Sequence, residues 1–176
     1  EFIDNFRQDQ TNYDKEPYNL YLDDKRSSRT WALYVQDEFT ILENLILNIG
    51  LRYDYYDTFG GTTNPRAALI YRPFDLTTIK LLYGTAFHAP SPYELYYNDG
   101  NILSKANPDL KPETIETYEL VLEQSLGKGF RLGASLFLNK IKDLISLETD
   151  AADGLQIYRN VDRLETKGAE LELEKS

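Results

Sequence analysis

The sequence predicts an all-β fold, an antiparallel up-and-down meander of seven or eight strands. Apolar and polar residues alternate with a period of two along most of the chain, as they do in strands that expose their two faces to different surroundings. Short segments rich in glycine, proline, asparagine and aspartate separate these stretches. Helical patterns between the stretches are missing, which disfavours a fold of alternating strands and helices.

The first part of the chain contains the clearest alternation. Residues 1–28 are polar, and only residues 2–8 have a weak strand pattern. Residues 29–41 form a predicted strand, which a turn at 42–44 connects to the next strand, 45–56. One face of this second strand consists of Leu45, Leu47, Ile49, Leu51, Tyr53 and Tyr55. The composition of residues 58–64, rich in glycine and threonine, predicts a loop.

The remaining strands follow at regular intervals. Predicted strands occupy residues 66–72, 78–87, 114–124, 130–138 and 155–175. The pattern of the strand at 130–138 can continue as far as residue 147, and residues 155–175 form one strand or two. The turns near Glu43, Phe74 and Lys128 are short, whereas the connections near Gly60, Asp99 and Asp150 are longer. Because each connection reverses the chain direction, we expect all short turns at one end of the sheet and all long loops at the other.

Composition excludes several function classes. The 176 residues include 29 acidic and 19 basic side chains, for a formal charge of −10, and a chain this acidic repels nucleic-acid phosphates. Cysteine is absent from the sequence, which removes disulfides and thiolate chemistry. Length alone predicts one domain or a piece of one. No apolar run reaches the 18 residues or so of a membrane helix, but a barrel strand needs only about 10 alternating residues.

Residues with catalytic or metal-binding chemistry are few. His88 is the only histidine and has no surrounding nucleophile motif, so we expect it at the base of a loop and not in an active site. The acidic residues of 143–153 lack the spacing of a calcium loop. Glu170, Glu172 and Glu174 alternate on one strand face, which favours a hydrated row over a glycosidase pair. The sequence therefore predicts no catalytic residue, no metal site and no cofactor.

Several short motifs occur together in one order. They are Asn-Pro-Arg-Ala-Ala-Leu-Ile-Tyr-Arg-Pro at 64–73, Ala-Phe-His-Ala-Pro-Ser at 86–91, Tyr-Glu-Leu-Tyr at 93–96, Asn-Pro-Asp-Leu-Lys-Pro-Glu at 107–113, Tyr-Glu-Leu at 118–120, Leu-Asn-Lys-Ile-Lys-Asp-Leu-Ile at 138–145, Tyr-Arg-Asn-Val at 158–161 and Lys-Gly-Ala-Glu-Leu-Glu at 167–172. In this order and spacing, over about two-thirds of the chain, the sequence resembles the barrel of TonB-dependent outer-membrane receptors. His88 departs from that pattern, in which arginine or lysine more often precedes Ala-Pro.

The resemblance implies a location and a transport function. It implies that residues 1–176 are part of a 22-stranded barrel in a Gram-negative outer membrane, in contact with lipid, without the N-terminal plug and the terminal strands. It further implies uptake of a metal chelate, a ferric siderophore or cobalamin, captured by external loops and driven by TonB through the plug. The motif order is closest to the cobalamin and catecholate-siderophore branch.

The loop at residues 88–112 is the expected ligand-binding region. Aromatic rings and hydrogen-bonding groups together suit a bulky chelate. The candidate ligand-binding residues are Tyr93, Tyr96, Tyr97, Asn98, Asp99 and Asn101. The motifs at 93–96 and 107–113 have a structural interpretation, in which they fold the loop base between prolines. The tip, 97–105, is the better candidate for ligand contact.

Two other classes of protein remain open. A self-contained eight-stranded outer-membrane barrel, serving as an adhesin or structural protein, would pair its first strand with its last. A soluble β-sandwich that binds carbohydrate or protein would bury the apolar row between two sheets. Tyr53, Tyr55, Tyr71 and Tyr83 lie late in their apolar rows, as expected of rings at a membrane interface, and favour a membrane barrel.

Overall fold

The computed structural model describes residues 1–161 and 163–175. In this part of the chain it contains ten strands and one short helix. These are β1 (Phe2–Lys15), β2 (Tyr18–Leu42), β3 (Leu45–Tyr56), β4 (Gly60–Phe74), β5 (Thr77–His88), α1 (Pro92–Tyr96), β6 (Glu113–Gly127), β7 (Phe130–Lys142), β8 (Leu144–Thr149), β9 (Gln156–Val161) and β10 (Leu164–Lys175). None of the described helical residues belongs to a helix long and apolar enough to span a membrane.

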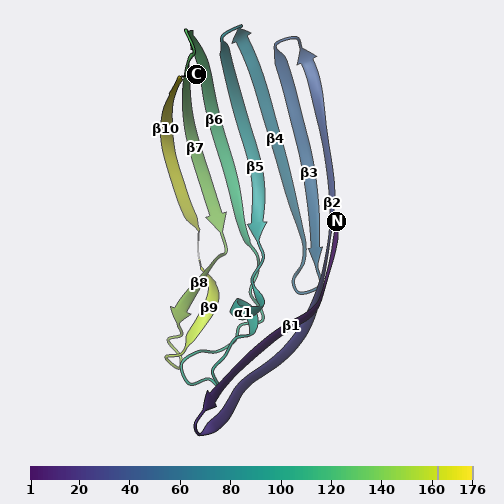
Figure 1. The fold of residues 1–176 in the computed structure, drawn as a ribbon, viewed down its shortest axis with the longest axis vertical. Coiled ribbons are helices and arrows are strands. Elements are labelled where there is room, and N and C mark those ends of the chain that lie inside the picture. Colours follow the sequence, from purple (N-terminus) through teal and green to yellow (C-terminus); the bar gives the residue numbers. More distant parts are fainter. Residues whose placement is uncertain (162, 176) are drawn as a thin grey trace.

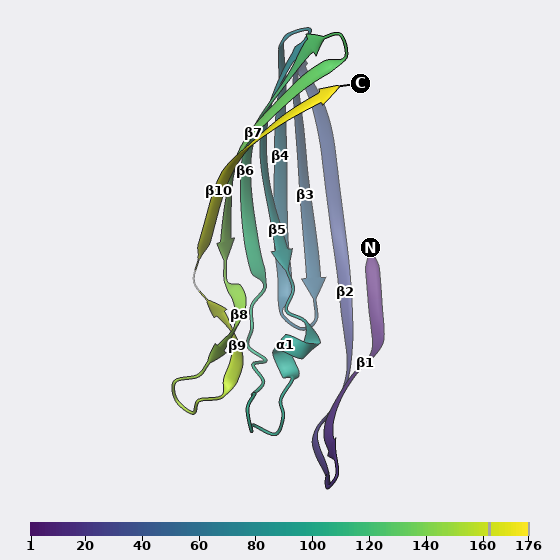
Figure 2. The same ribbon diagram turned by 60° about the vertical axis from the view of Figure 1, so that its left-hand side comes forward.

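Eight of the strands form one antiparallel sheet in the order β1-β2-β3-β4-β5-β6-β7-β10. The sheet is a single curved layer, and β8 and β9 form a separate hairpin beyond the ends of β7 and β10 (Figures 1 and 2). Sequence neighbours are also sheet neighbours up to β7, which makes the fold an up-and-down meander. The predicted fold class is confirmed.

The strand register joins the apolar rows into one continuous face. Leu47 pairs with Phe39 and Leu69, and Leu81 pairs with Leu69 and Leu120. This face is not covered by a second layer, because Leu33, Leu136 and Leu171 expose 66%, 57% and 77% of their surface. The prediction of a soluble sandwich, which requires this row to be buried, is wrong.

The two edges of the sheet lie far apart in strand order. Among the described residues, β1 pairs only with β2, and β10 pairs only with β7. A closed eight-stranded barrel requires these two strands to pair with each other. The self-contained small barrel is therefore wrong, and the sheet formed by the described residues is open.

The loop predicted at 58–64 is wrong, because β4 begins at Gly60 and only residues 57–59 form the turn. Gly61 reflects crowding between strands. It pairs with Tyr55, and a Cβ atom on it would lie 2.2 Å from the hydroxyl oxygen of the diagonal neighbour Tyr53, so the Tyr53 ring requires a residue without a side chain at this position. Glycine and threonine at 60–64 thus continue the ladder with β3.

The N-terminal segment also differs from expectation. Residues 1–28, of which only 2–8 have a weak strand pattern, form the β1–β2 hairpin that extends beyond the rest of the sheet (Figure 1). Its strands are polar on both faces because they project past the apolar band. The predicted strand 155–175 consists of two pieces, β9 and β10, and residue 162 between them lies outside the described residues.

The ends of the sheet differ as the connection lengths predict. The turns at Glu43, Asp75 and Lys128 lie at the upper end in Figure 1, and the 89–112 loop, β8–β9 and the β1–β2 hairpin lie at the lower end. Aromatic rings gather toward this lower end. The centroid of the Trp31 ring lies 5.4 Å from that of Tyr53 and 5.5 Å from that of Tyr55. The ring centroids of Tyr83 and Tyr118 are 5.1 Å apart. Tyr71 lies toward the other end, opposite Leu45, because β4 runs in the opposite direction.

Candidate functional site

The long loop between β5 and β6 begins with a capped helical turn. The Ser91 hydroxyl accepts a hydrogen bond from the Glu94 backbone N–H, and the Glu94 carboxylate accepts one from the Ser91 N–H at 2.7 Å. Pro92 occupies the first turn, where its missing N–H has no cost. The signal Ser-Pro-x-Glu is a capping box, which identifies this helix in a segment expected to be irregular.

Helix α1 places two of the candidate tyrosines against a third ring. The rings of Tyr93 and Tyr97 stack with centroids 4.5 Å apart, and the Tyr158 ring of β9 meets Tyr93 edge-on at 6.3 Å. Burial raises the pKa of the Tyr97 and Tyr158 hydroxyls. Tyr93 remains half exposed, so the cluster presents an aromatic surface to solvent. Tyr158 lies 61 residues or more from these partners in sequence, and its motif at 158–161 did not indicate that it contacts the long loop.

The same loop contacts the β1–β2 hairpin. The Arg26 guanidinium lies 3.5 Å from the centroid of the Tyr96 ring and is also paired with Asp24 at 2.5 Å. The Tyr97 hydroxyl accepts a hydrogen bond from the Asn12 amide at 3.2 Å. Sequence reasoning missed Arg26 and Asn12, because the polar segment that holds them carries no recognisable motif.

The other three candidate residues shape the loop tip. The Asp99 carboxylate accepts hydrogen bonds from the N–H groups of residues 102, 103 and 104, and these bonds lower its pKa. The Asn98 side-chain oxygen accepts one from the Gly100 N–H at 3.1 Å, and Asn101 adopts a left-handed φ of 60°. The Asn98 and Asp99 side chains are therefore engaged in turn geometry, and Asn101 contributes a left-handed backbone conformation to the turn. A direct ligand contact from them stays a prediction.

An ion cluster ties the loop to the β8–β9 hairpin. The Lys105 ammonium lies 2.6 Å from carboxylate oxygens of both Asp150 and Asp153, and Arg159 lies 2.7 Å from Asp150. These bonds raise the pKa of Lys105 and lower the pKa of Asp150 to about 2. The acidic segment 143–153, which lacks the spacing of a calcium loop, thus includes two carboxylates that fasten the long loop.

Backbone bonds reinforce this attachment. Lys105 N–H donates to the Gln156 carbonyl at 2.9 Å, and Gln156 N–H donates to the Leu103 carbonyl at 2.7 Å. The Asn107 amide donates to the Tyr158 carbonyl, and Asn160 exchanges two 2.8 Å bonds with the backbone of Lys111. We call residues 89–112 and 144–161 together the loop arm, since these bonds make them one unit.

A hollow of about 350 Å³ opens between the loop arm, the β1–β2 hairpin and the β3–β4 turn. Its lining combines aromatic and proline surface with one guanidinium, from Tyr56, Phe59, Pro90, Pro92, Tyr96 and Arg26. The Tyr56 and Phe59 rings stack at 4.6 Å, and the Phe87 ring meets both at their edges. Such a mixture of apolar area and few polar groups suits a bulky organic ligand.

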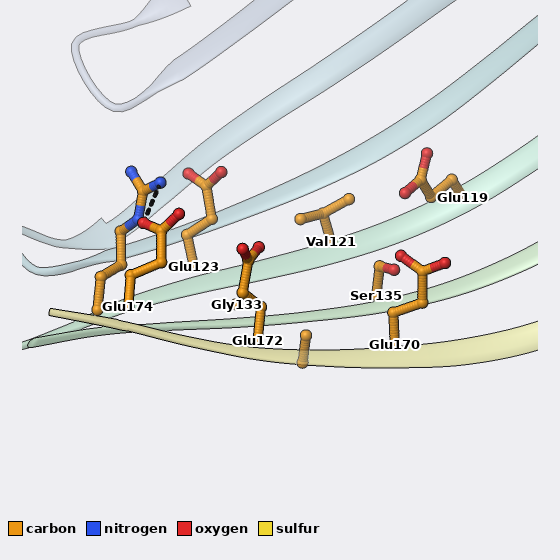
Figure 3. Close-up of a pocket in the computed structure, with 10 residues that line it drawn as sticks. Glu119, Val121, Glu123, Gly133, Ser135, Glu170, Glu172 and Glu174 are labelled. Atoms are coloured by element: carbon orange, nitrogen blue, oxygen red, sulfur yellow. Dashed lines mark ion pairs between the residues drawn. The ribbon is translucent and has the colours of Figure 1, made fainter.

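Acidic side chains gather on the face of the sheet opposite the apolar row. Figure 3 shows Glu119 and Glu123 of β6 rising to the same side as Glu170, Glu172 and Glu174 of β10. Arg131 pairs with Glu174 at 2.9 Å, and Lys80 pairs with Glu123 at 2.7 Å. The hydrated glutamate row predicted from alternation is thus extended by two glutamates of a second strand. His88 lies at the loop base as expected, 3.2 Å from Glu113.

The comparisons with known proteins agree with this architecture. The family pattern described as TonB dependent receptor-like, beta-barrel matches residues 1–175. The chain belongs to the TonB-dependent receptor family. Its strands are part of the barrel domain of these outer-membrane receptors, which are not enzymes.

Individual relatives carry names connected with iron. The chain is 33% identical over 170 residues to the iron-regulated outer membrane virulence protein of Vibrio cholerae, covering 85% of this chain and 26% of the relative. It is 27% identical over 150 residues to the ferric enterobactin receptor of Pseudomonas aeruginosa, covering 76% and 20%. The crystal structure of the siderophore receptor PirA from Pseudomonas aeruginosa superposes with a TM-score of 0.74 at 25% identity, covering 84% and 28%. The chain thus spans about a quarter of the length of these relatives.

Proposed function

We propose that this chain forms part of the wall of a receptor that takes up an iron chelate, a ferric siderophore, across the outer membrane. Membership of the TonB-dependent receptor family and the iron-related names of several relatives support this proposal. The observation that carries it is the hollow at the long-loop end, where Arg26 and Tyr96 face a space lined by aromatic rings.

The chemistry of this hollow fits an aromatic, anionic chelate. Flat aromatic groups of a ligand pack on Tyr96 and Phe59, which line the hollow. The Arg26 guanidinium offers positive charge and several donors beside the rings, which favours oxygen-rich anionic groups. Asp24 neutralises part of that charge, so a ligand competes with this carboxylate for Arg26.

The two faces of the sheet have separate roles in this proposal. The exposed apolar face contacts membrane lipid, and the acidic face contacts water inside the barrel. In the whole receptor, loops at the long-loop end capture the chelate, and TonB acts through an N-terminal plug to open a path. The barrel has 22 strands in this proposal, of which eight are those of the large sheet.

Uptake in iron-starved cells tests the ligand class. The full-length receptor is produced in a strain without other siderophore receptors, and ferric enterobactin and cyanocobalamin are the probes. We expect uptake of ferric enterobactin, with at least a tenfold loss of affinity when Arg26→Ala and Tyr96→Ala are combined, since central aromatic and arginine contacts contribute about 1–3 kcal/mol each.

A matched control separates this effect from general damage. Phe74 is an exposed aromatic residue at the opposite end of the sheet, and Phe74→Ala should leave affinity unchanged. Uptake of cyanocobalamin without uptake of any ferric chelate would overturn the assignment to iron. An equal loss of affinity in Phe74→Ala would show that the effect does not arise in the hollow.

A further inference from the structure

Three lysines lie on the apolar face at its long-loop end. Lys140 and Lys142 follow Leu138 at alternate positions of β7, and Lys167 of β10 is the register partner of Leu138. Strand alternation therefore places them on the same face as Leu136, which is exposed in the middle of the apolar band. We call these three residues the lysine cluster.

The lysine cluster begins where the aromatic rings end. Tyr118 pairs with Leu138 across β6 and β7, and the Lys140 ammonium lies 5.6 Å from the Tyr118 ring centroid. Lys140 is two residues, about 7 Å, beyond Leu138 along the strand. Tyrosine rings mark the boundary between hydrocarbon and headgroups in membrane barrels. The cluster therefore lies at the level of lipid headgroups.

Two of the three lysines have no ion-pair partner among the described residues. Lys142 is paired with Glu116 at 2.5 Å. Lys140 and Lys167 form no ion pair with any described residue, although Glu165 is the register partner of Lys140. Counting three lysines against Glu116 and Glu165, the patch carries a net charge of +1 on a chain of charge −10.

The geometry suits one shared anion. Lys140 pairs with Glu165 and Lys167 pairs with Leu138, so the two free lysines are diagonal neighbours on adjacent strands. Side chains in this relation start about 7–8 Å apart and reach a common point. Long lysine side chains extend along apolar surface and hold their ammonium groups at the polar boundary. Two flexible ammonium groups on the same face suit a phosphate that approaches from the lipid.

We propose that the lysine cluster binds the phosphate of a membrane lipid headgroup in the leaflet at the long-loop end. The proposal rests on the proposed contact of the apolar face with lipid. Charge complementarity selects the occupant, because a neutral headgroup leaves Lys140 and Lys167 without a counter-ion. The bound lipid would anchor the sheet at the β7–β10 pair, next to the point where the loop arm is attached.

Native mass spectrometry of the full-length receptor in mild detergent tests this proposal. The probes are phosphatidic acid and diacylglycerol with the same acyl chains, which differ only in the phosphate. We expect phosphatidic acid to bind at least fivefold more tightly, and the Lys140→Gln/Lys167→Gln variant to lose this preference. Lys140→Arg/Lys167→Arg should retain it.

The control keeps the number of removed charges equal. Lys25→Gln/Lys128→Gln alters the β1–β2 hairpin and the β6–β7 turn, and its lipid preference should remain that of the unmodified receptor. Equal binding of the two lipids, or an unchanged preference in the Lys140→Gln/Lys167→Gln variant, would overturn the proposal. Failure of iron uptake leaves this result unaffected, since no siderophore is present. Absence of all lipid binding would instead contradict the contact of the apolar face with lipid.

Discussion

The ammonium nitrogen of Lys105 lies 2.6 Å from a carboxylate oxygen of Asp150, and this pair joins two segments 45 residues apart in the sequence. The contact fastens the tip of the 89–112 loop to the β8–β9 hairpin. The opposite side of the loop meets the β1–β2 hairpin mainly through the Arg26–Tyr96 contact and one hydrogen bond from Asn12. The 89–112 loop is thus held more firmly on the side of the β8–β9 hairpin, and the hollow lies on its other side, toward the β1–β2 hairpin.

Lys105→Gln should loosen the loop arm without unfolding the sheet. It removes both carboxylate contacts but leaves the backbone bonds to Gln156 in place. We expect amide hydrogen exchange at Leu103, Lys105 and Gln156 to become about two- to fivefold faster, the range of an exposed ion-pair network. Lys25→Gln removes an exposed pair with Asp23 elsewhere and should leave those amides unchanged. Unaltered exchange in Lys105→Gln would contradict the role of this cluster.

The attachment of the 89–112 loop to the β8–β9 hairpin should weaken in acid and stay unchanged near neutral pH. Bonding to Lys105 lowers the pKa of Asp150 to about 2, so the contribution of Asp150 is complete above the ordinary range of an aspartate and is lost as pH falls through about 2. The pKa of Lys105 is raised, so its contribution is complete below its ordinary value and is lost only in strong base. Spin labels at Ile102→Cys and Ala152→Cys should keep one distance from pH 5 to 9 and separate as the pH falls towards about 2. A change between pH 6 and 8 would be inconsistent with this assignment.

The cap of α1 should stabilise the first half of the long loop. Ser91→Ala removes the hydroxyl that accepts from Glu94 N–H, and loss of such a cap costs about 1 kcal/mol. We expect about fivefold faster exchange of the Leu95 and Tyr97 amides, which donate to the Ser91 and Tyr93 carbonyls. Ser91→Thr keeps the hydroxyl and should retain protection. Equal exchange in both variants would show that the cap does not hold the helix.

Gly168 should be required for the β7–β10 pairing. A Cβ atom there would lie 2.5 Å from the Phe137 ring, whereas at Gly133 the nearest atom is the Glu172 Cβ at 3.8 Å. Gly168→Ala should lower the unfolding temperature seen by heat-dependent gel mobility, since such overpacking costs about 1–3 kcal/mol. Gly133→Ala should have a smaller effect, and Gly168→Ala/Phe137→Leu should recover part of the loss. An equal decrease in both single variants would exclude the ring contact as the cause.

Sequence alternation predicted the sheet because period two follows directly from strand geometry. Strand β3 spans Leu45–Tyr56, and its apolar row runs from Leu45 to Tyr55. The β1–β2 hairpin lacks that signal because polar residues lie on both of its faces. Gly60 and Gly61 predicted a loop because composition does not reveal that the Tyr53 ring lies over Gly61.

The candidate site was predictable only within the long loop itself. Tyr93, Tyr96 and Tyr97 lie at its aromatic cluster and hollow, as expected of their position after a motif. Arg26 and Tyr158 reach the same region through pairing of distant strands, which one sequence does not display. The polarity of Asp99 predicts ligand contact, but three backbone N–H groups already donate to its carboxylate.

The central claim is that one face of this sheet contacts hydrocarbon and the other contacts water. Ser135 and Leu136 are adjacent in β7, and they lie on the acidic and apolar faces respectively. Spin labels at Ser135→Cys and Leu136→Cys, one at a time in the membrane-embedded full-length receptor without other cysteines, measure this difference through relaxation by oxygen and by a water-soluble nickel complex. We expect oxygen to dominate at 136 and to have no such advantage at 135. Preferential access of the nickel complex to position 136, or equal oxygen preference at both positions, would contradict the account.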